Sequence, residues 1–148
     1  MILLDVNVLV YSHREDMAEH ADFAAWLTGL AEGTEPFALC AGSVAGFVRV
    51  VTHPKIFVNP TSLDVALRFI DGLTESPACR WVEPGDRWWS IFVRLCHDSR
   101  ARANHVPDAQ LAATALEHGY RVATGDRGFA RYAGLRWFHP LADIEGRR

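Results

Sequence analysis

The sequence predicts a single α/β domain, residues 1–148, in which helices cover both faces of a central parallel sheet of about five strands. The chain is long enough for one domain with a buried core. Short apolar runs alternate along it with segments whose apolar residues recur at helical spacing. Such alternation is typical of a parallel sheet with crossover helices, and no repeat, linker or low-complexity run interrupts it.

The first part of the chain predicts two strands separated by a helix. Residues 2–6 (ILLDV) form an apolar run ending in an acid, which suits a buried strand, and residues 37–41 (FALCA) form a second. Between them, residues 15–31 carry apolar side chains at spacings of three to five, the pattern of an amphipathic helix. These side chains belong to Ala18, Phe23, Trp26, Leu27 and Leu30.

The middle of the chain predicts two helices and a third strand. Ser43 is a candidate N-cap for a helix that ends near Val51. Residues 62–74 predict a second helix, with Ser62 as its candidate cap. The third strand, residues 79–83, ends at a Pro-Gly turn.

The last part predicts two helices and two strands. Residues 86–98 predict a helix, and a second helix opens at Pro107 and stops at Gly119. Strands at residues 121–124 and 135–138 complete the sheet. The inward side chains of the first helix are expected to be Trp89, Phe92, Val93 and Cys96.

Composition limits the class of protein. The formal charge of −3 argues against nucleic-acid binding through overall positive charge, although a local basic patch is compatible with it. Lys55 is the only lysine among the 15 basic residues, and arginine suits bidentate phosphate contacts, but genomic base composition gives the same bias. No apolar run is long enough to span a bilayer, and the N-terminus lacks the basic region of a signal peptide. We therefore expect no membrane association.

The three cysteines indicate neither disulfides nor a zinc site. Cys40, Cys79 and Cys96 are odd in number, far apart, and form no CxxC pair. Buried free thiols in a reducing compartment are the better interpretation, so the expected location is cytoplasmic.

Three acids are expected to meet at one edge of the sheet. Asp5 ends the first strand, Asp126 follows the fourth, and Asp108 lies in the first turn of the helix that leads to it. A crossover helix begins at the edge where parallel strands end, so the three carboxylates converge there. Their mutual repulsion is relieved by a hard divalent ion such as Mg²⁺, which takes oxygen ligands and suits phosphate substrates. Asp5, Asp108 and Asp126 are thus the candidate metal ligands and catalytic residues.

Each candidate also has a structural interpretation. Asp108 favours the helix macrodipole, and Asp126 is a common turn residue before a glycine. Asp5 is hardest to explain in this way, because a carboxylate in an apolar strand is unfavourable unless paired. Asn7 and Thr124 flank the site and are candidates to orient ligands or water or to contact substrate, although Asn7 equally suits a helix cap.

Four motifs in order give the chain a family resemblance. They are LLDVNVLVY at 3–11, FVRVVTHPKIF at 47–57, VPDAQLAATALEHG at 106–119 and VATGDRGFARYAGLRWFHPL at 122–141. With these motifs the chain resembles the PIN domain, and within it the VapC toxins of bacterial toxin–antitoxin pairs. The resemblance implies a Mg²⁺- or Mn²⁺-dependent endoribonuclease acting on RNA. It also implies a VapB-type antitoxin that covers the active site, and a homodimer.

The sequence departs from the family pattern at two glycines. Many PIN domains carry a glutamate where Gly46 stands, and many carry an acid where Gly128 stands. Three carboxylates therefore remain, which leaves open whether one metal or two would bind. A PIN-like module that binds RNA or a partner without efficient cleavage is the alternative function.

Several basic residues are candidates for RNA contact. Arg100, Arg102 and His105 precede the helix of Asp108, and Arg49 lies in the second motif. Plain solvent exposure remains the alternative for each. Asp98 is a candidate further ligand, but a solvated helix end explains it better.

Other enzyme classes find little support. No GxSxG elbow or GxxxxGK[ST] loop is present, which argues against a serine hydrolase and an NTPase. A phosphotransferase with an aspartate after its first strand needs a lysine at the site, and Lys55 is the only one.

Overall fold

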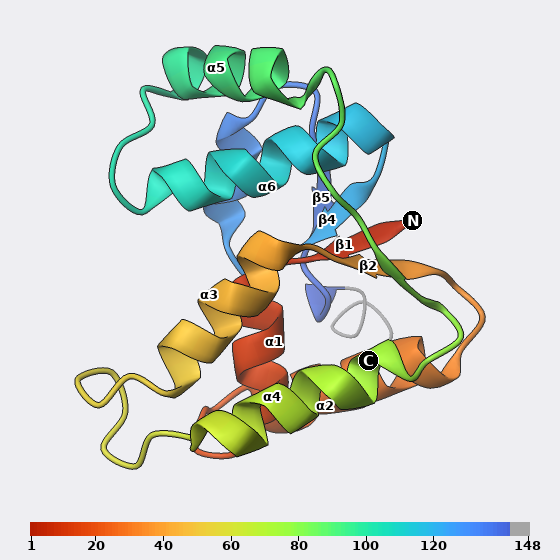
Figure 1. Ribbon diagram of the computed structural model, residues 1–148, viewed down its shortest axis with the longest axis vertical. Helices are drawn as coiled ribbons and strands as arrows, with labels where there is room; N and C mark the ends of the chain where they lie inside the picture. The colour runs from red at the N-terminus through yellow and green to blue at the C-terminus, as the bar shows by residue number, and fades with distance from the viewer. Residues whose placement is uncertain (143–148) are drawn as a thin grey trace.

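The predicted fold class is confirmed by the computed structural model, which describes residues 1–142. Five strands form one parallel sheet in the order β3-β2-β1-β4-β5 (Figure 1). All five lie within the predicted segments, but each is only three residues long. The strands are β1 (Ile2–Leu4), β2 (Phe37–Leu39), β3 (Cys79–Trp81), β4 (Arg121–Ala123) and β5 (Arg136–Phe138).

Two helical segments were not predicted from the sequence. The first is α1, which begins directly after Asp5, and the second is η1, a 3₁₀ helix after Asp126. Three successive residues of α1, Val8 to Val10, are buried, and such an apolar run does not distinguish a buried helix from a strand. The helices are α1 (Val6–His13), α2 (His20–Glu32), α3 (Ala41–Val51), α4 (Leu63–Thr74), α5 (Trp88–Ser99), α6 (His105–His118) and η1 (Arg127–Arg131).

The predicted helix ends were partly right. The Ser62 hydroxyl accepts from the backbone N–H of Val65 at 3.3 Å, so the predicted cap of α4 is confirmed. The predicted cap at Ser43 was wrong, because α3 begins two residues earlier. Ser43 is buried inside that helix, with its hydroxyl 3.3 Å from the Cys40 thiol. Gly119 ends α6 in the left-handed conformation, with φ of 70°, as predicted.

One side chain of α5 that was predicted to face inward faces outward. Trp89 was expected to face inward, but its side chain is 65% exposed, and Leu95 is the fully buried residue of this helix. Trp89 instead lies beside Trp88 and Phe92, which stack with ring centroids 4.8 Å apart. Phe92 and Cys96 pack against the core beneath α5 as predicted, and so does Trp88, so Trp89 alone of these aromatic side chains is largely exposed.

Cys40, Cys79 and Cys96 are free thiols, as predicted, but Cys79 and Cys96 are half-buried and Cys40 alone of the three is buried. Within residues 1–142, no helix is long and apolar enough to cross a membrane.

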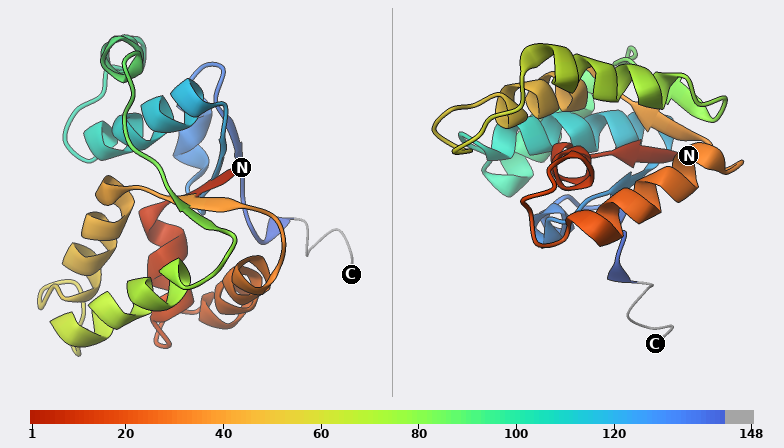
Figure 2. Two further views of the ribbon diagram at one scale, coloured as in Figure 1. Left: turned by 45° about the vertical axis from the view of Figure 1, so that its right-hand side comes forward. Right: turned by 90° about the horizontal axis from the view of Figure 1, so that it is seen from below.

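The sheet separates two apolar cores. Alternate residues of β1 point to opposite faces: Ile2 and Leu4 contact the core beneath α1 to α4, and Leu3 contacts the core beneath α5 and α6. The left panel of Figure 2 shows these two helical layers on either side of the sheet. Helices thus lie on both faces as predicted, and the two central strands β1 and β2 are accordingly apolar and buried throughout.

The strand order places a topological switch beside β1. The chain moves outward from β1 to β2 and β3, then crosses the sheet through α5 and α6 to β4 on the other side of β1. Connections therefore leave the carboxyl ends of β1 and β4 in opposite directions. In open α/β sheets, a crevice for ligands forms at such a point.

The loop between α3 and α4 is fixed to the end of α1 by Arg14. Its guanidinium donates to the carbonyl of Asn59 at 2.8 Å and to the Thr61 hydroxyl at 3.2 Å. It also lies 4.0 Å over the Phe57 ring and pairs with both carboxylate oxygens of Asp16. Only 10% of the Arg14 side chain is exposed, so its contacts to the loop are shielded from water, whereas its partner Asp16 is 55% exposed.

Arg14→Ala is expected to lower the free energy of unfolding by about 2–3 kcal/mol, because it removes several shielded hydrogen bonds and a cation–π contact. Arg121→Ala is the matched control. Arg121 also pairs with a carboxylate, Glu35, and lies 4.5 Å over a ring, that of Phe138, but its side chain is 44% exposed. Its loss is expected to change stability by less than about 1 kcal/mol. Urea unfolding of both variants makes the comparison, and equal losses would contradict the role given to Arg14.

Candidate functional site

A cleft of about 800 Å³ opens at the carboxyl edge of the sheet. Its walls are the segments that follow β1, β2, β3 and β4, together with the start of α6. Asp5, Asp108 and Asp126 all line it, so the structure brings together the three acids that topology was expected to unite.

Asp5 is held rigidly at the bottom of this cleft. It directly follows β1 and caps α1, with its Oδ1 accepting the backbone N–H of Val6 at 2.7 Å. Its Oδ2 accepts from the Thr124 hydroxyl at 2.7 Å and from the Asn7 amide at 2.8 Å. The residue is only 6% exposed, which explains why it needs so many donors.

Burial nevertheless dominates the ionisation of Asp5. It raises the pKa of this carboxyl to about 6, and the nearby Asp108 and Asp126 add to the rise. The hydrogen bonds from Thr124 and Val6 oppose it without cancelling it. The charged form is therefore disfavoured in the protein alone and would be favoured by a bound cation.

The other two acids differ in their surroundings. Asp108 is half-buried in the first turn of α6, where burial and the charge of Asp126 raise its pKa. Asp126 is exposed, and its Oδ1 accepts the backbone N–H of Gly128 at 2.7 Å. Asp126 thus has the turn role considered from the sequence, and it still lines the cleft.

The three acids have no positively charged partner in the described part of the chain. Within residues 1–142, none of them forms an ion pair. In the same part of the chain, no three His, Cys, Asp or Glu side chains are drawn together closely enough to form a complete ligand set. Mg²⁺ fits such an open arrangement, because it keeps several waters and needs only one or two carboxylates as direct ligands.

Asn7 and Thr124 connect the ends of β1 and β4. The fully buried Thr124 hydroxyl accepts from the Asn7 amide at 3.1 Å and from the backbone N–H of Asp126 at 3.0 Å. The Asn7 carbonyl oxygen accepts the N–H of Gly125 at 2.9 Å. Because Thr124 has no exposed surface, the prediction that it contacts substrate does not fit. Both residues orient Asp5, as the alternative interpretation proposed.

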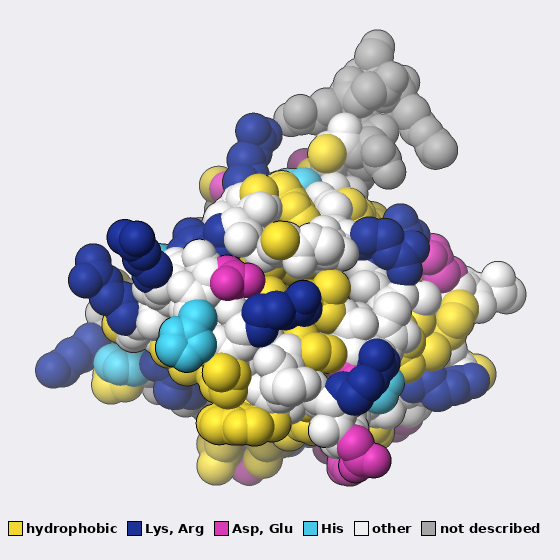
Figure 3. Space-filling model, turned by 90° about the horizontal axis from the view of Figure 1, so that it is seen from above, with side chains coloured by type: hydrophobic (Ala, Val, Ile, Leu, Met, Phe, Trp, Pro, Cys, Tyr) yellow, Lys and Arg dark blue, Asp and Glu magenta, His cyan; other side chains and the backbone are white. Residues whose placement is uncertain are grey.

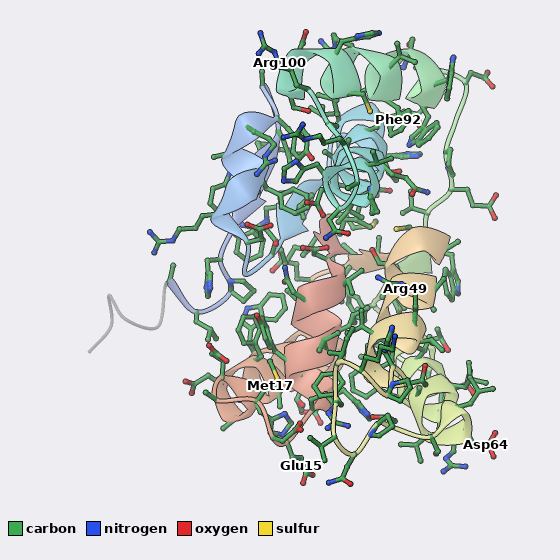
Figure 4. All side chains as sticks on the ribbon, turned by 90° about the vertical axis from the view of Figure 1, so that its left-hand side faces the viewer. Glu15, Met17, Arg49, Asp64, Phe92 and Arg100 are labelled. Atoms are coloured by element: carbon green, nitrogen blue, oxygen red, sulfur yellow. The ribbon has the colours of Figure 1, made fainter. Side chains whose placement is uncertain are left out.

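The predicted basic residues lie at different distances from the cleft. Arg49, on α3, is exposed and lines it. Arg100 and Arg102 are exposed but are not among the lining residues, and Figure 4 shows Arg100 at the end of α5, well separated from Arg49. Seen from the side of α5, the surface carries more arginine than acidic side chains (Figure 3). RNA contact by Arg100 and Arg102 stays a prediction, and it would require substrate to extend beyond the cleft.

Gly46 faces the cleft but has little free space. A Cβ atom there would lie 2.8 Å from the Cγ2 of Val6, the residue that follows Asp5. Close packing against Val6 therefore accounts for the glycine at this position.

One part of the cleft was missed because α1 was missed. Tyr11 lines the cleft together with Asn7, and the two are four residues apart on one face of this helix. Met17, Ile56 and Phe57 extend the cleft into an apolar end. An acid at this place suits a helix cap, but the apolar run from Val8 to Val10 carries no helical periodicity that would have predicted α1.

The sequence matches a known family along most of its length. The family model described as PIN domain matches residues 2–135. The ribonuclease VapC43 of Mycobacterium tuberculosis is 47% identical over 141 residues, covering 95% of this chain and 96% of the relative.

Solved structures show the same fold. The chain resembles VapBC2 from Rickettsia felis, solved bound to a promoter DNA fragment, with a TM-score of 0.70 and 16% identity over 94% of this chain and 98% of that one. FitAcB from Neisseria gonorrhoeae gives a TM-score of 0.68 and 25% identity, covering 96% and 99% of the two chains.

The raised pKa of Asp5 predicts a pH-dependent effect of Asp5→Asn on stability. A carboxyl whose pKa is higher in the folded than in the unfolded chain stabilises the fold at low pH, and this contribution is lost as pH rises through the folded value of about 6. In EDTA, the free energy of unfolding of the wild type should fall by about 1–2 kcal/mol relative to that of the variant as the pH rises from 5 to 8.

Urea unfolding at the two pH values measures this difference. Asp71→Asn, an exposed change on α4, controls for the loss of one negative charge. If the difference in unfolding free energy between wild type and Asp5→Asn is the same at both pH values, the raised pKa assigned to Asp5 is contradicted.

Proposed function

The chain belongs to the PIN-domain family, in its VapC group, and from this premise we propose that it is a metal-dependent endoribonuclease, the toxin of a toxin–antitoxin pair. One observation carries the proposal: three carboxylates face a single cleft at the switch point of the sheet, and none of them is paired with a cation of the described chain. A site of this kind suits a divalent ion and the phosphate of a nucleic acid. The ribonuclease names of its relatives support RNA as the substrate.

Asp5, Asp108 and Asp126 would hold the ion, which we propose to be Mg²⁺ or Mn²⁺. Such an ion supplies a water of lowered pKa and neutralises negative charge on the phosphate. Asn7 and Thr124 keep the Asp5 carboxylate in one orientation, so that its position does not depend on the ion. Arg49, which also lines the cleft, would contact the RNA backbone.

Two protein partners belong to the proposal. A VapB-type antitoxin is supported by the structural relative solved as VapBC2. A second copy of the chain is supported by the exposed side chain of Trp89 on α5, which lies beside the half-buried ring of Phe92. Helix α2 offers less surface for such a contact, because Trp26 packs against Phe138.

Asp108→Asn is expected to reduce RNA cleavage by about 10²–10³-fold while leaving the fold intact, since it removes charge from the centre of the cleft. No hydrogen bond to the Asp108 side chain is made within residues 1–142, so the amide disrupts no contact there. Cleavage of a labelled single-stranded RNA is followed in Mg²⁺, in Mn²⁺ and in EDTA. If wild type binds the RNA but cleaves it in none of these, the chain is instead an RNA-binding module of the PIN fold.

Gly46→Glu tests whether a fourth carboxylate fits the site. Alone, it should lower stability by about 1–3 kcal/mol, because the new Cβ overlaps Val6. Combined with Val6→Ala, the overlap is relieved and the glutamate should raise Mg²⁺ affinity above that of Val6→Ala alone. Calorimetric titration with Mg²⁺ measures the affinities, and melting curves report the coupling between the two changes. An unchanged affinity in the folded double variant would show that position 46 does not face the metal.

A further inference from the structure

The 3₁₀ helix η1 is fixed beside the first turn of α6. The Tyr132 hydroxyl donates to the carbonyl of His105 at 3.1 Å, and the Phe129 side chain is fully buried. Figure 4 shows η1, in pale blue, standing next to the start of α6. Residues of η1 are therefore held close to Asp108 without belonging to the cluster of acids.

Arg131 is a cation that this arrangement brings close to the acids, just outside the residues that line the cleft. Its Nε donates to the carbonyl of Gly128 at 2.8 Å. A Cβ atom at Gly128 would lie 2.8 Å from the Arg131 Nη2 and 2.9 Å from the Asp126 Oδ1. The guanidinium and the carboxylate thus flank the same point of backbone, and the absence of a side chain at position 128 makes room for both.

Arg131 is near the acids without being neutralised by them. Within residues 1–142 it forms no ion pair, whereas Arg14 and Arg121 are each tied to a carboxylate. Its charge nevertheless reaches Asp108, where burial raises the pKa and Arg131 opposes the rise. With Nε occupied by Gly128, the two terminal nitrogens remain available to a further acceptor.

Resting on the proposed ribonuclease function, we infer that Arg131 is a substrate-contacting residue, whose terminal nitrogens bind a phosphate of the RNA beside Asp108 and Asp126. A polyanion that approaches three carboxylates needs a fixed positive charge close to them. Guanidinium supplies this charge with a planar pair of donors that matches phosphate oxygens. The contact to Gly128 presets the direction of the group, so less side-chain freedom is lost when phosphate binds.

Arg136 provides a matched control at the opposite edge of the sheet. It is exposed, and its Nη2 donates to the carbonyl of Gly119 at 2.6 Å, just as Arg131 is anchored on a glycine carbonyl. It stands at the start of β5, at the amino ends of the strands, whereas the acids lie at their carboxyl ends. Arg131→Gln and Arg136→Gln each remove one charge and one bond to a carbonyl.

The test measures RNA binding separately from cleavage. Fluorescence anisotropy with a labelled 12-nucleotide single-stranded RNA in EDTA gives the salt dependence of affinity for wild type and variants. Each phosphate contact to a single strand contributes about 0.7 to the slope of log affinity against log salt. Arg131→Gln should lower that slope by about 0.7, and Arg136→Gln should leave it unchanged. Arg131→Lys keeps the charge and should restore the slope, while cleavage in Mg²⁺ stays impaired because the planar pair of donors is lost.

The outcomes separate this inference from the function on which it rests. If wild type binds and cleaves the RNA and Arg131→Gln retains the wild-type slope and rate, the inference is overturned and the proposed function stands. If wild type neither binds nor cleaves RNA, both are overturned. Loss of slope in both glutamine variants would mean a general effect of charge and would also overturn the specific role of Arg131. Melting curves of the two variants check that both are folded.

Discussion

The hydrogen-bonded carboxylate of Asp5 is the contact on which the site depends. It links the end of β1, the start of α1 and the end of β4 through Val6, Thr124 and Asn7. Thr124 in turn accepts the backbone N–H of Asp126, so two of the three acids are positioned by one hydroxyl. A buried acid normally opposes folding, but here its donors come from two neighbouring strand ends and fix their relative geometry. The acid at the centre of the cleft therefore also holds the cleft together.

The sheet explains why a cleft exists at this place. Connections leave β1 and β4 in opposite directions, so no helix covers the edge between them. The surrounding walls depend on separate contacts: Arg14 fixes the loop that carries Phe57, and the Tyr132 hydroxyl fixes η1 to α6. Substrate-facing parts of the molecule are thus loops and helix ends, each held by a few polar contacts to the rigid layers beneath.

Charge is distributed unevenly around this edge. The three acids are unpaired within the described chain, and Arg49 and Arg131 also form no ion pair there. Carboxylates that share a cleft without a positively charged partner disfavour one another's ionisation. Burial is the largest cause of the raised pKa values of Asp5 and Asp108, and the neighbouring negative charges add to the rise.

The sequence by itself determined the fold class, the five strands, most helices and the placement of Asp5, Asp108 and Asp126 in one cleft. These follow from periodicity and from the rule that parallel strands end at one edge, which need no side-chain detail. Tertiary structure decided that residues after Asp5 form α1, because a fully apolar segment has no periodicity to distinguish helix from strand. It also decided that Trp89 faces outward, that Gly46 packs on Val6 and that Arg131 lies against Gly128. The geometry of these contacts depends on how the helices pack on the sheet, and the periodicity of the sequence does not determine that packing.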